Sequence, residues 1–535
     1  MPNTVVVIGN YAFMAQYSGC RSLTYAATEY ISPNITEIDH EFRRQQYYNC
    51  RRLTTPSVEH MPDSIISVGD YFRYQTYAGA NSSSAPNITT APAEKHSVNL
   101  EQIGHYFRTS QYRLCGNLTV AATEAPINVI EIPDYFRNSQ YYGCSKLVSI
   151  SDEAPTTAQV IGGNFRGGQY LNTAITTAAQ PTSTGAMIIG AGFRVSQYYG
   201  CTNLVTIFDE VPENPTTIGD DFMADTYSGC TSLEHPAQEY ASDITIEIGT
   251  DFRASQYSGC SKLLYSPDEK ISKNVLTIQR NFRDSQYINC VNLSSVGKEA
   301  FPEAATYVAT LFRRQQYYNI GMAIAADEAP MPNVTSTEGS STTDNFRGFQ
   351  YASSKITEIG KETDIPKLTF VGRGFRRGQY QDCPNIKNLN KYSEGKTPVL
   401  NSISSGGGYR DSQFKNSGIL YALKEDENFN GFSPGPSFRN SQYMNCYYLQ
   451  EIYEEKFVTA TTYINFFRTS QFENCVGLDL TNKNIIQKLT TANNSVFRTR
   501  QFAGTSFNAS NPINYLDGTP VIEGQDSIPT NFYTD

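Results

Sequence analysis

The sequence predicts an α/β repeat solenoid in which short strands and one short helix make up each rung of about 30 residues. Three observations support this fold class. The phrase Phe-Arg-x-x-Gln-Tyr returns, in full or in part, seventeen times; an Ile-Gly step precedes many of the copies; and all eleven cysteines follow the closing aromatic of the phrase by three residues. A repeat of this length cannot bury its apolar face alone, so stacked rungs share one elongated core. The closing aromatics are Tyr17, Tyr47, Tyr77, Tyr112, Tyr141, Tyr170, Tyr198, Tyr227, Tyr257, Tyr287, Tyr317, Tyr351, Tyr380, Phe414, Tyr443, Phe472 and Phe502.

The elements of one rung are clearest between Ile132 and Ile161. On a helix of about 100° per residue, Phe136, Gln140 and Cys144 would share one face, which predicts a short helix over the repeated phrase. Residues 147–150 read as a short strand because branched residues recur there between turn residues. An acidic turn at residues 152–155 and a second short strand into the next Ile-Gly step complete the rung; in residues 244–249 that strand shows apolar and polar alternation.

Stacking such rungs predicts a curved chain. Neighbouring strands lie about 4.8 Å apart, whereas packed helices prefer about 8–10 Å. Strands inside the bend and helices outside would satisfy both spacings. We expect residues 1–329 to form a regular solenoid, 330–506 a degenerate continuation with insertions, and 507–535 a C-terminal cap. The first rung has no polar shield, so either a preceding segment is absent or the chain begins without a cap.

Composition excludes several function classes. The net charge of −10, from 42 Lys plus Arg and 52 Asp plus Glu, argues against nucleic acid as the main partner. Since no apolar run approaches the roughly 20 residues that span a bilayer, we expect no membrane insertion. The N-terminus also lacks the features of a secretory signal. Five histidines form no metal-ligand motif, and no nucleophile or phosphate-loop motif is present, so we expect no cofactor, no metal and no enzymatic activity.

The cysteine positions predict buried structural thiols. Where cysteine is missing, its slot is held mostly by Ala, Ser or Thr, which indicates a small buried site. An odd number of cysteines in one repeat phase supplies disulfide pairs poorly, and one thiol per rung does not converge on a metal. The thiols expected in this structural ladder include Cys115, Cys144, Cys201 and Cys260.

Arginine occupies its position in fifteen of the seventeen repeats, Phe13 and Met223 being the exceptions, and two interpretations stay open. The first is an internal Arg–Glu ladder, with each guanidinium also against the motif tyrosine. The matching acidic column lies nine residues after the cysteine slot: Glu29, Glu59, Glu124, Glu153, Glu210, Glu239, Glu269, Glu299 and Glu455. The second is a ligand stripe for anionic glycans or partner carboxylates. That stripe would comprise Arg108, Arg137, Tyr141, Arg166, Arg194, Tyr198, Arg253, Tyr257 and Arg283.

The glutamine column falls on the apolar face of the repeat, where an unpaired amide would be costly. An amide both donates and accepts, so stacked glutamines can satisfy one another from rung to rung. This predicted internal ladder includes Gln111, Gln140, Gln169, Gln197 and Gln256, and Thr76 and Thr226 interrupt it.

One string within the repeat resembles a known family. Residues 248–252 (Ile-Gly-Thr-Asp-Phe), followed by Ser258-Gly259-Cys260 and Leu263, are similar to the BspA-like (Treponema-type) leucine-rich repeat family, as are residues 8–13. The resemblance is strong over residues 1 to about 330, although leucine-rich repeats usually run 20–29 residues. It implies a bacterial or protist cell-surface repeat protein used for adhesion and for binding proteins or surface glycans through a curved face, located outside the cell. The alternative is a structural subunit whose copies stack end to end into an extracellular fibre.

Overall fold

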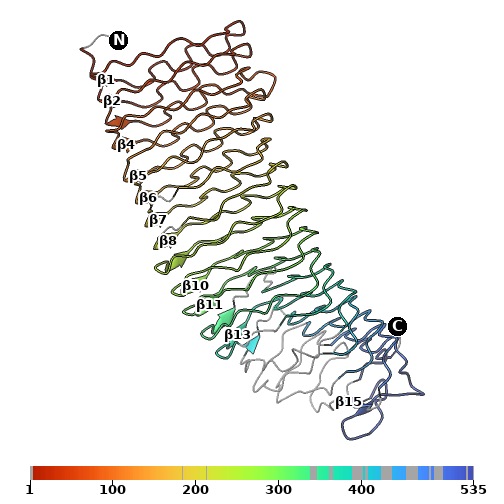
Figure 1. Cartoon of the computed structure of the whole chain (residues 1–535). Coiled ribbons are helices and arrows are strands. Elements are labelled where there is room, and N and C mark those ends of the chain that lie inside the picture. The colour runs from red at the N-terminus through yellow and green to blue at the C-terminus, as the bar shows by residue number, and fades with distance from the viewer. Residues whose placement is uncertain are drawn as a thin grey trace. The chain divides into compact units, whose positions relative to one another are not determined.

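The computed structural model describes residues 4–182, 185–211, 214–337, 346–360, 365–387, 402–403, 408–422, 437–452, 468–480, 483–486, 498–525 and 528–533. It is a parallel β-solenoid whose rungs follow one another in sequence order (Figure 1). The chain divides into two compact units: Met1–Leu263 with Lys270–Ser272, and Leu264–Glu269 with Lys273–Asp535.

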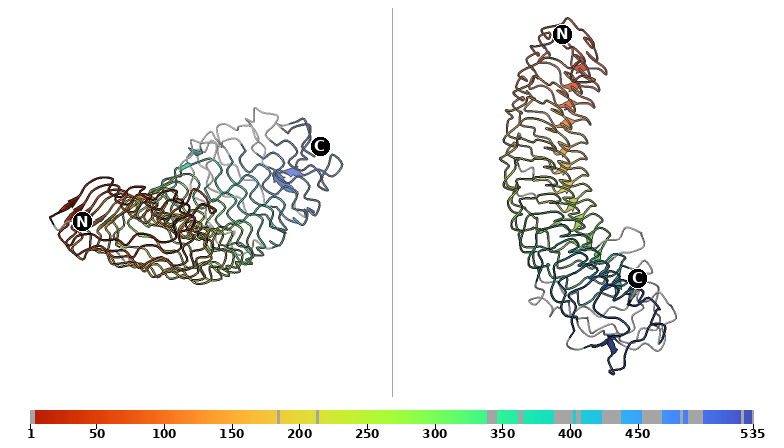
Figure 2. Two further views of the ribbon diagram at one scale, coloured as in Figure 1. Left: turned by 90° about the horizontal axis from the view of Figure 1, so that it is seen from above. Right: turned by 90° about the vertical axis from the view of Figure 1, so that its right-hand side faces the viewer.

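Strands in the first unit form two ladders. One contains β1 (Val7–Ile8), β2 (Glu37–Ile38), β3 (Ser67–Val68) and β4 (Gln102–Ile103); the other contains β5 (Glu131–Ile132), β6 (Val160–Ile161), β7 (Ile188–Ile189), β8 (Thr217–Ile218) and β9 (Glu247–Ile248). Every pairing is parallel and joins equivalent positions of consecutive rungs, such as Ile8 with Ile38. The second residue of each strand is buried, and the first is exposed or half-exposed. Figure 2 shows the strands of this unit in one row.

The second unit continues the pattern with β10 (Thr277–Ile278), β11 (Tyr307–Val308), β12 (Ser336–Thr337), β13 (Phe370–Val371) and β14 (Ser402–Ile403), which form one parallel ladder. A separate pair, β15 (Asn484–Ile486) and β16 (Asn514–Tyr515), lies nearer the C-terminus. The strand predicted at the Ile-Gly step is therefore confirmed. The strand predicted at residues 147–150 is shorter than expected, because pairing there is limited to isolated bridges such as Val120 with Ser149.

The predicted helix is wrong: no helix occurs among the described residues. The repeated phrase instead alternates between right- and left-handed backbone conformations, as at Tyr135 (φ 61°), Arg137 (φ 50°) and Ser139 (φ 53°). A left-handed residue with a side chain costs roughly 1–2 kcal/mol, so the conformation needs compensation from outside the segment.

Hydrogen bonds between rungs supply that compensation. The amides of Tyr135 and Ser139 donate to the carbonyls of Gly163 and Gly167 in the next rung, at 2.7 and 2.8 Å, whereas the amide of Arg137 donates backwards to the carbonyl of Phe107 at 2.9 Å. The intervening amides close turns within the rung, as Gln140 does on the carbonyl of Arg137. The predicted curvature depended on the difference between the spacing of paired strands and that of packed helices. Because the described rungs contain no helix, this reason for curvature does not apply to them.

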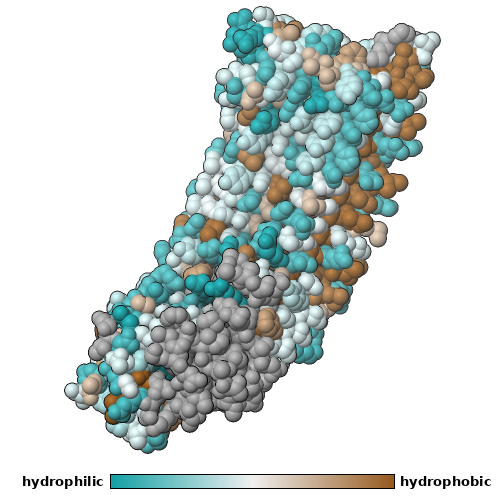
Figure 3. Space-filling model, turned by 180° about the vertical axis from the view of Figure 1, so that it is seen from behind, coloured by the Kyte–Doolittle hydropathy of each residue, from teal (hydrophilic) through white to brown (hydrophobic). Residues whose placement is uncertain are grey.

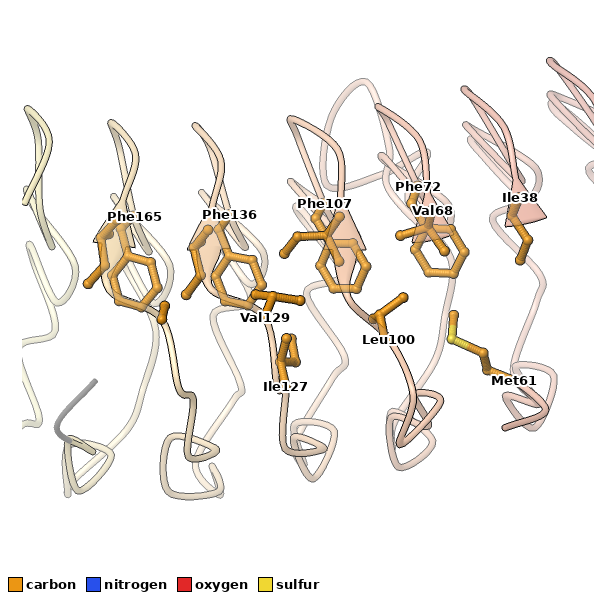
Figure 4. Packing of buried hydrophobic residues seen from close by; sticks show 14 of the residues in the cluster. Ile38, Met61, Val68, Phe72, Leu100, Phe107, Ile127, Val129, Phe136 and Phe165 are labelled. Carbon is orange, nitrogen blue, oxygen red and sulfur yellow. The ribbon is translucent and has the colours of Figure 1, made fainter. Parts of the chain in front are cut away.

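The core of the first unit consists of side chains stacked by repeat position. The motif phenylalanines lie face to face in a row (Figure 4), with ring centroids 5.5 Å apart for Phe42 and Phe72 and 5.6 Å for Phe107 and Phe136. The second residues of the strands, such as Ile38 and Val68, pack against this row. The core of this unit therefore consists of columns to which each rung contributes one residue, unlike the mixed core of a globular domain.

The predicted domain boundaries at residues 329/330 and 506/507 stay predictions. Within the second unit, Phe502 contacts Phe507 and Phe532, with ring centroids 6.3 and 5.2 Å apart. The amides of Arg500 and Phe502 donate to the carbonyls of Asn531 and Phe532. The segment after residue 506 thus accepts hydrogen bonds from amides of the last rung that carries the repeated phrase, as a cap would.

Candidate functional site

The arginine column lies inside the rungs and forms a staggered ladder with the acidic column. Arg108 donates through both Nη atoms to Glu59, at 2.8 and 2.6 Å, and Arg166 does the same to Glu124, at 2.7 Å twice. In each case the glutamate comes from two rungs earlier, while the glutamate one rung earlier is more distant, as for Arg166 and Glu153 at 3.8 Å. Glu59 therefore bridges Arg73 and Arg108, and Glu124 bridges Arg137 and Arg166.

The same pairing recurs through both units. Further contacts join Arg43 and Arg73 to Glu29, Arg73 to Glu59, Arg137 to Glu94 and Glu124, Arg194 to Glu153, Arg253 to Glu210, Arg283 and Arg313 to Glu269, Arg347 to Glu299, and Arg347 and Arg376 to Glu328. Glu94 and Glu328 belong to the column although the nine-residue spacing did not select them. Glu455 lies outside the described residues.

The ladder keeps its charges despite burial. Burial by itself would raise the pKa of Glu124, but the neighbouring Arg137 and Arg166 hold that pKa below its ordinary value. Burial would also lower the pKa of Arg108, yet Glu59 and Glu94 raise it. At Arg43, which contacts Glu29 alone, burial prevails and the pKa is lowered. Two carboxylates per guanidinium therefore offset the desolvation of this column.

The glutamines connect neighbouring rungs as the sequence predicted. The amide of Gln140 donates to the side-chain oxygen of Gln111 at 3.4 Å, and Gln169 and Gln197 continue the chain at 3.2 Å each. Gln169 also donates to Glu124 at 3.2 Å, which ties the amide column to the charge ladder. Gln256 is buried at the same repeat position.

The aromatic partner of the guanidinium is the motif phenylalanine rather than the predicted tyrosine. Arg137 lies 4.9 Å from the ring centre of Phe136, and Arg194 lies 5.0 Å from that of Phe193. This correction follows from the absence of a helix, which would have set Arg137 beside Tyr141. The motif tyrosines instead stack on one another, as Tyr141 does on the next rung at 5.5 Å, and its hydroxyl accepts the amide of Ala122.

The cysteine column consists of free thiols, ten buried and only Cys20 exposed. Several of these thiols also make a hydrogen bond that the sequence did not reveal. The thiol of Cys144 donates to the carbonyl of Tyr112 in the preceding rung at 3.1 Å, and Cys115, Cys201 and Cys260 donate in the same way to Tyr77, Tyr170 and Tyr227. Ser354 keeps this bond to Tyr317 at 2.9 Å. The signal was the substitution pattern: serine and threonine share a donor with cysteine.

All residues of the predicted ligand stripe are buried. Arg108, Arg137, Arg166, Arg253 and Arg283 lie within the charge ladder, as does Arg194, and Tyr141, Tyr198 and Tyr257 lie within the tyrosine stack. A ligand role for these residues stays a prediction. In the described structure their guanidinium groups face carboxylates inside the rungs, which leaves them no outward surface.

An exposed apolar surface runs instead along the strands of the first unit. We call it the strand stripe and define it as Val6, Val7, Ile66, Ile130, Met187, Ile188, Ile244 and Ile246, whose exposed fractions run from 42% to 68%. Figure 3 shows hydrophobic side chains gathered along the side of this unit where the strands lie. Apolar and polar residues alternate in residues 244–249, which predicted a strand there. Burial there instead repeats every third residue, at Ser242, Thr245 and Ile248, which turns the two isoleucines outward.

Metal and membrane features were also sought. Across the described ranges, no three His, Cys, Asp or Glu side chains come together in a way that could hold a metal ion. The same residues include no helix suited to crossing a bilayer.

No family model matches the chain, and no curated protein matches it. Solved structures that resemble the chain include leucine-rich-repeat proteins. A leucine-rich cell-surface protein from Faecalibacterium prausnitzii is 15% identical over 66% of this chain and 83% of that chain, with a TM-score of 0.27. A leucine-rich-repeat protein from Bacteroides ovatus is 17% identical over 60% and 82%, with a TM-score of 0.23. The pneumococcal vaccine antigen PcpA is 9% identical over 72% and 78%, with a TM-score of 0.24.

Proposed function

We propose that this chain is a non-enzymatic cell-surface repeat protein that binds other proteins through the strand stripe of its first unit. The observation that carries the proposal is the stripe itself. Its side chains are large and apolar, and they are 42% to 68% exposed along the parallel strands. Exposed apolar side chains gathered in this way mark interaction sites in soluble proteins.

The backbone beneath the stripe is already satisfied, which favours side-chain recognition over strand addition. The amides of Ile66, Met187 and Ile246 donate to the carbonyls of Thr36, Gln159 and Thr216 in the preceding rungs. A partner would therefore gain by covering apolar side chains, at roughly 1.5–3 kcal/mol for each one fully buried. Acidic residues at other positions of the strands, such as Glu37 and Glu131, are exposed between them and form a polar surround.

End-to-end stacking into a fibre stays the alternative, and one feature of the second unit weakens it. A following rung would need the amides of Arg500 and Phe502, but Asn531 and Phe532 already accept hydrogen bonds from them. A copy that adds at this end would first have to displace the segment after residue 506.

A matched pair of triple variants tests the proposal. Ile130→Glu/Met187→Glu/Ile246→Glu charges the strand stripe, and Val58→Glu/Val148→Glu/Val205→Glu charges valines that are comparably exposed outside it. Binding of the fluorescent chain to intact epithelial cells, before and after the cells are treated with protease, is measured by flow cytometry. We expect the stripe variant to lose at least tenfold in bound signal, the control to bind like the parent, and protease to remove the signal. Equal binding by both variants would overturn the proposal, and loss of signal with glycosidase alone would redirect it to glycans.

A further inference from the structure

The position directly before each strand of the first unit alternates between apolar and polar residues from rung to rung. Strands β1, β3, β5, β7 and β9 are preceded by apolar members of the strand stripe: Val6, Ile66, Ile130, Met187 and Ile246. Strands β2, β4, β6 and β8 are preceded by polar residues: Thr36, Glu101, Gln159 and Thr216. Along this column the stripe therefore repeats every two rungs and is not continuously apolar.

Backbone hydrogen bonds keep these residues in one column. The amide of Thr36 donates to the carbonyl of Val6 at 2.8 Å, that of Ile66 donates to Thr36 at 2.8 Å, and that of Met187 donates to Gln159 at 2.8 Å. Rungs that follow the spacing of paired strands lie about 4.8 Å apart, so two rungs span about 9.6 Å. The first and last apolar residues of the column precede β1 and β9, which places them about 38 Å apart.

A partner segment that meets every apolar residue of the column needs the same period. A polyproline II helix has three residues per turn and rises about 3.1 Å per residue, so every third residue returns to one face after about 9.3 Å. An α-helix returns to nearly the same face after seven residues, about 10.5 Å, and drifts by about 20° each time. An extended strand repeats after two residues, about 6.7 Å. Over four periods the polyproline II helix departs from the column by about 1 Å and the α-helix by about 4 Å.

The charges along the strands of this unit are all negative. Strands β1 to β9 and the positions directly before them contain no lysine or arginine, and their acidic residues are Glu37, Glu101, Glu131 and Glu247. All four glutamates are exposed, and in the described part of the chain none of them has a cationic partner. Lysine or arginine in the partner segment would therefore meet carboxylates along the whole column, which favours association and the correct register.

We propose that the strand stripe binds a segment in the polyproline II conformation, with an apolar residue at every third position and lysine or arginine between them. This inference rests on the proposed function, because it names the partner chemistry of the same surface. Each apolar residue of the segment lies against one apolar side chain of the column. Proline between the apolar residues holds the segment extended before it binds, which reduces the entropy lost on binding.

Fluorescence anisotropy of labelled synthetic peptides with the full chain tests the spacing and the charge. The probe is five repeats of Leu-Pro-Lys, which span about 46 Å as polyproline II. One control has the same composition with its leucines at irregular intervals, and the other is five repeats of Leu-Pro-Glu. We expect each control to bind at least tenfold more weakly than the probe. A control that binds as tightly as the probe, or no binding of the probe to the parent chain, would overturn the proposal.

A composition-matched variant of the chain tests the period directly. Ile130→Gln/Gln159→Ile moves one apolar residue by a single rung and leaves the composition of the column unchanged. Both positions are exposed, so we expect the variant to fold, as judged by circular dichroism. It should bind the probe at least tenfold more weakly than the parent, whereas a surface that recognises only apolar area would bind as before. Unchanged affinity in the folded variant would refute the spacing argument, and the peptide series decides the question alone if the variant does not fold.

The cell-binding assay separates failure of this inference from failure of the proposed function. If Ile130→Glu/Met187→Glu/Ile246→Glu abolishes cell binding while the parent chain does not bind the probe, the strand stripe binds proteins of another conformation and only this inference fails. If the same variant binds cells like the parent, the proposed function itself fails.

Discussion

At one place in the first unit the ladder lacks both partners: Thr182 holds the acidic position of the sixth repeat, and Met223 holds the arginine position of the eighth repeat. Copying this gap into an intact part of the ladder measures how strongly its charges are coupled. Glu124 and Arg166 have the same two-rung relation as Thr182 and Met223, so Glu124→Thr and Arg166→Met reproduce the gap one side at a time. Glu124→Thr leaves Arg137 and Arg166 with one carboxylate each, and Arg166→Met leaves Glu124 with one arginine. Removing one member of a buried pair typically costs about 3–5 kcal/mol.

The double variant removes one positive and one negative charge together, so each charge that remains beside the gap keeps one partner of opposite sign. Arg137 keeps Glu94, and Glu153 keeps Arg194. We therefore expect Glu124→Thr/Arg166→Met to lose about as much stability as one single variant, which corresponds to a coupling free energy of about 3 kcal/mol or more. A surface control, Glu131→Thr, should stay within about 0.5 kcal/mol of the parent because Glu131 is exposed.

Urea unfolding followed by circular dichroism gives the four stabilities of this cycle. Hydrogen exchange of the Arg166 amide, which donates to Phe136, reports the local opening that a repeat protein undergoes before global unfolding. If the loss in the double variant equals the sum of the two single losses within about 0.5 kcal/mol, the pair is not coupled and the ladder reasoning fails.

Three further outcomes are expected. Burial lowers the pKa of His96 to about 4, so the folded chain resists protonation and loses stability as the pH falls from 6.5 towards 4. His96→Met introduces the residue that the preceding rung holds at the same position, Met61. It should reduce the fall in melting temperature between pH 6.5 and 4.5, and an unchanged fall would contradict this. Burial, with Asp221 and Asp251 nearby, raises the pKa of Asp225 to about 6, so Asp225→Asn should gain less than about 2 kcal/mol at pH 7 and nothing at pH 4 in paired melts. Cys144→Ser should keep the bond to the preceding carbonyl, as Ser354 does, and lose under about 1 kcal/mol in urea unfolding, whereas Cys144→Val should lose more; the reverse order would show that the slot needs only apolar volume.

The helix was mispredicted because burial in the repeated phrase imitates helical spacing. From Phe136 to Cys144, two buried residues alternate with two less buried ones, so the pattern returns every four residues. A period of four is hard to separate from 3.6 over nine residues. One signal for the true conformation was present: the position before the cysteine slot often holds Gly or Asn, as at Gly143 and Asn172, and these residues adopt positive φ most readily. Positive φ at Arg137 could not be read from sequence, because the hydrogen bonds of neighbouring rungs impose it.

For the charge ladder, more could be predicted from the sequence than for the repeated phrase. Equal spacing of like residues predicted a glutamine ladder and offered an internal Arg–Glu ladder as one of two interpretations, since identical rungs stack in register. The sequence could not show that Arg166 pairs with Glu124 from two rungs earlier, because this depends on how far each side chain extends along the stack. The strand stripe was missed because a strand of only two residues, such as β9, does not follow the apolar and polar alternation that the sequence shows in residues 244–249.

The hydrogen bonds between rungs run in opposite directions in the repeated phrase and beside the strands. In the repeated phrase of the second rung, the amides of Glu41, Gln45, Tyr47 and Asn49 donate to the next rung, and that of Arg43 donates back. Beside the strand of the same rung, the amides of Thr36 and Asp39 donate back to the carbonyls of Val6 and Ile8. At the first rung the former arrangement leaves the carbonyl oxygens of Asn10, Met14, Gln16 and Ser18 facing away from the stack, with no donor among the described residues. Two copies meeting at this edge would oppose oxygen to oxygen along the repeated phrase, so a segment that extends the column there must present N–H groups at these positions.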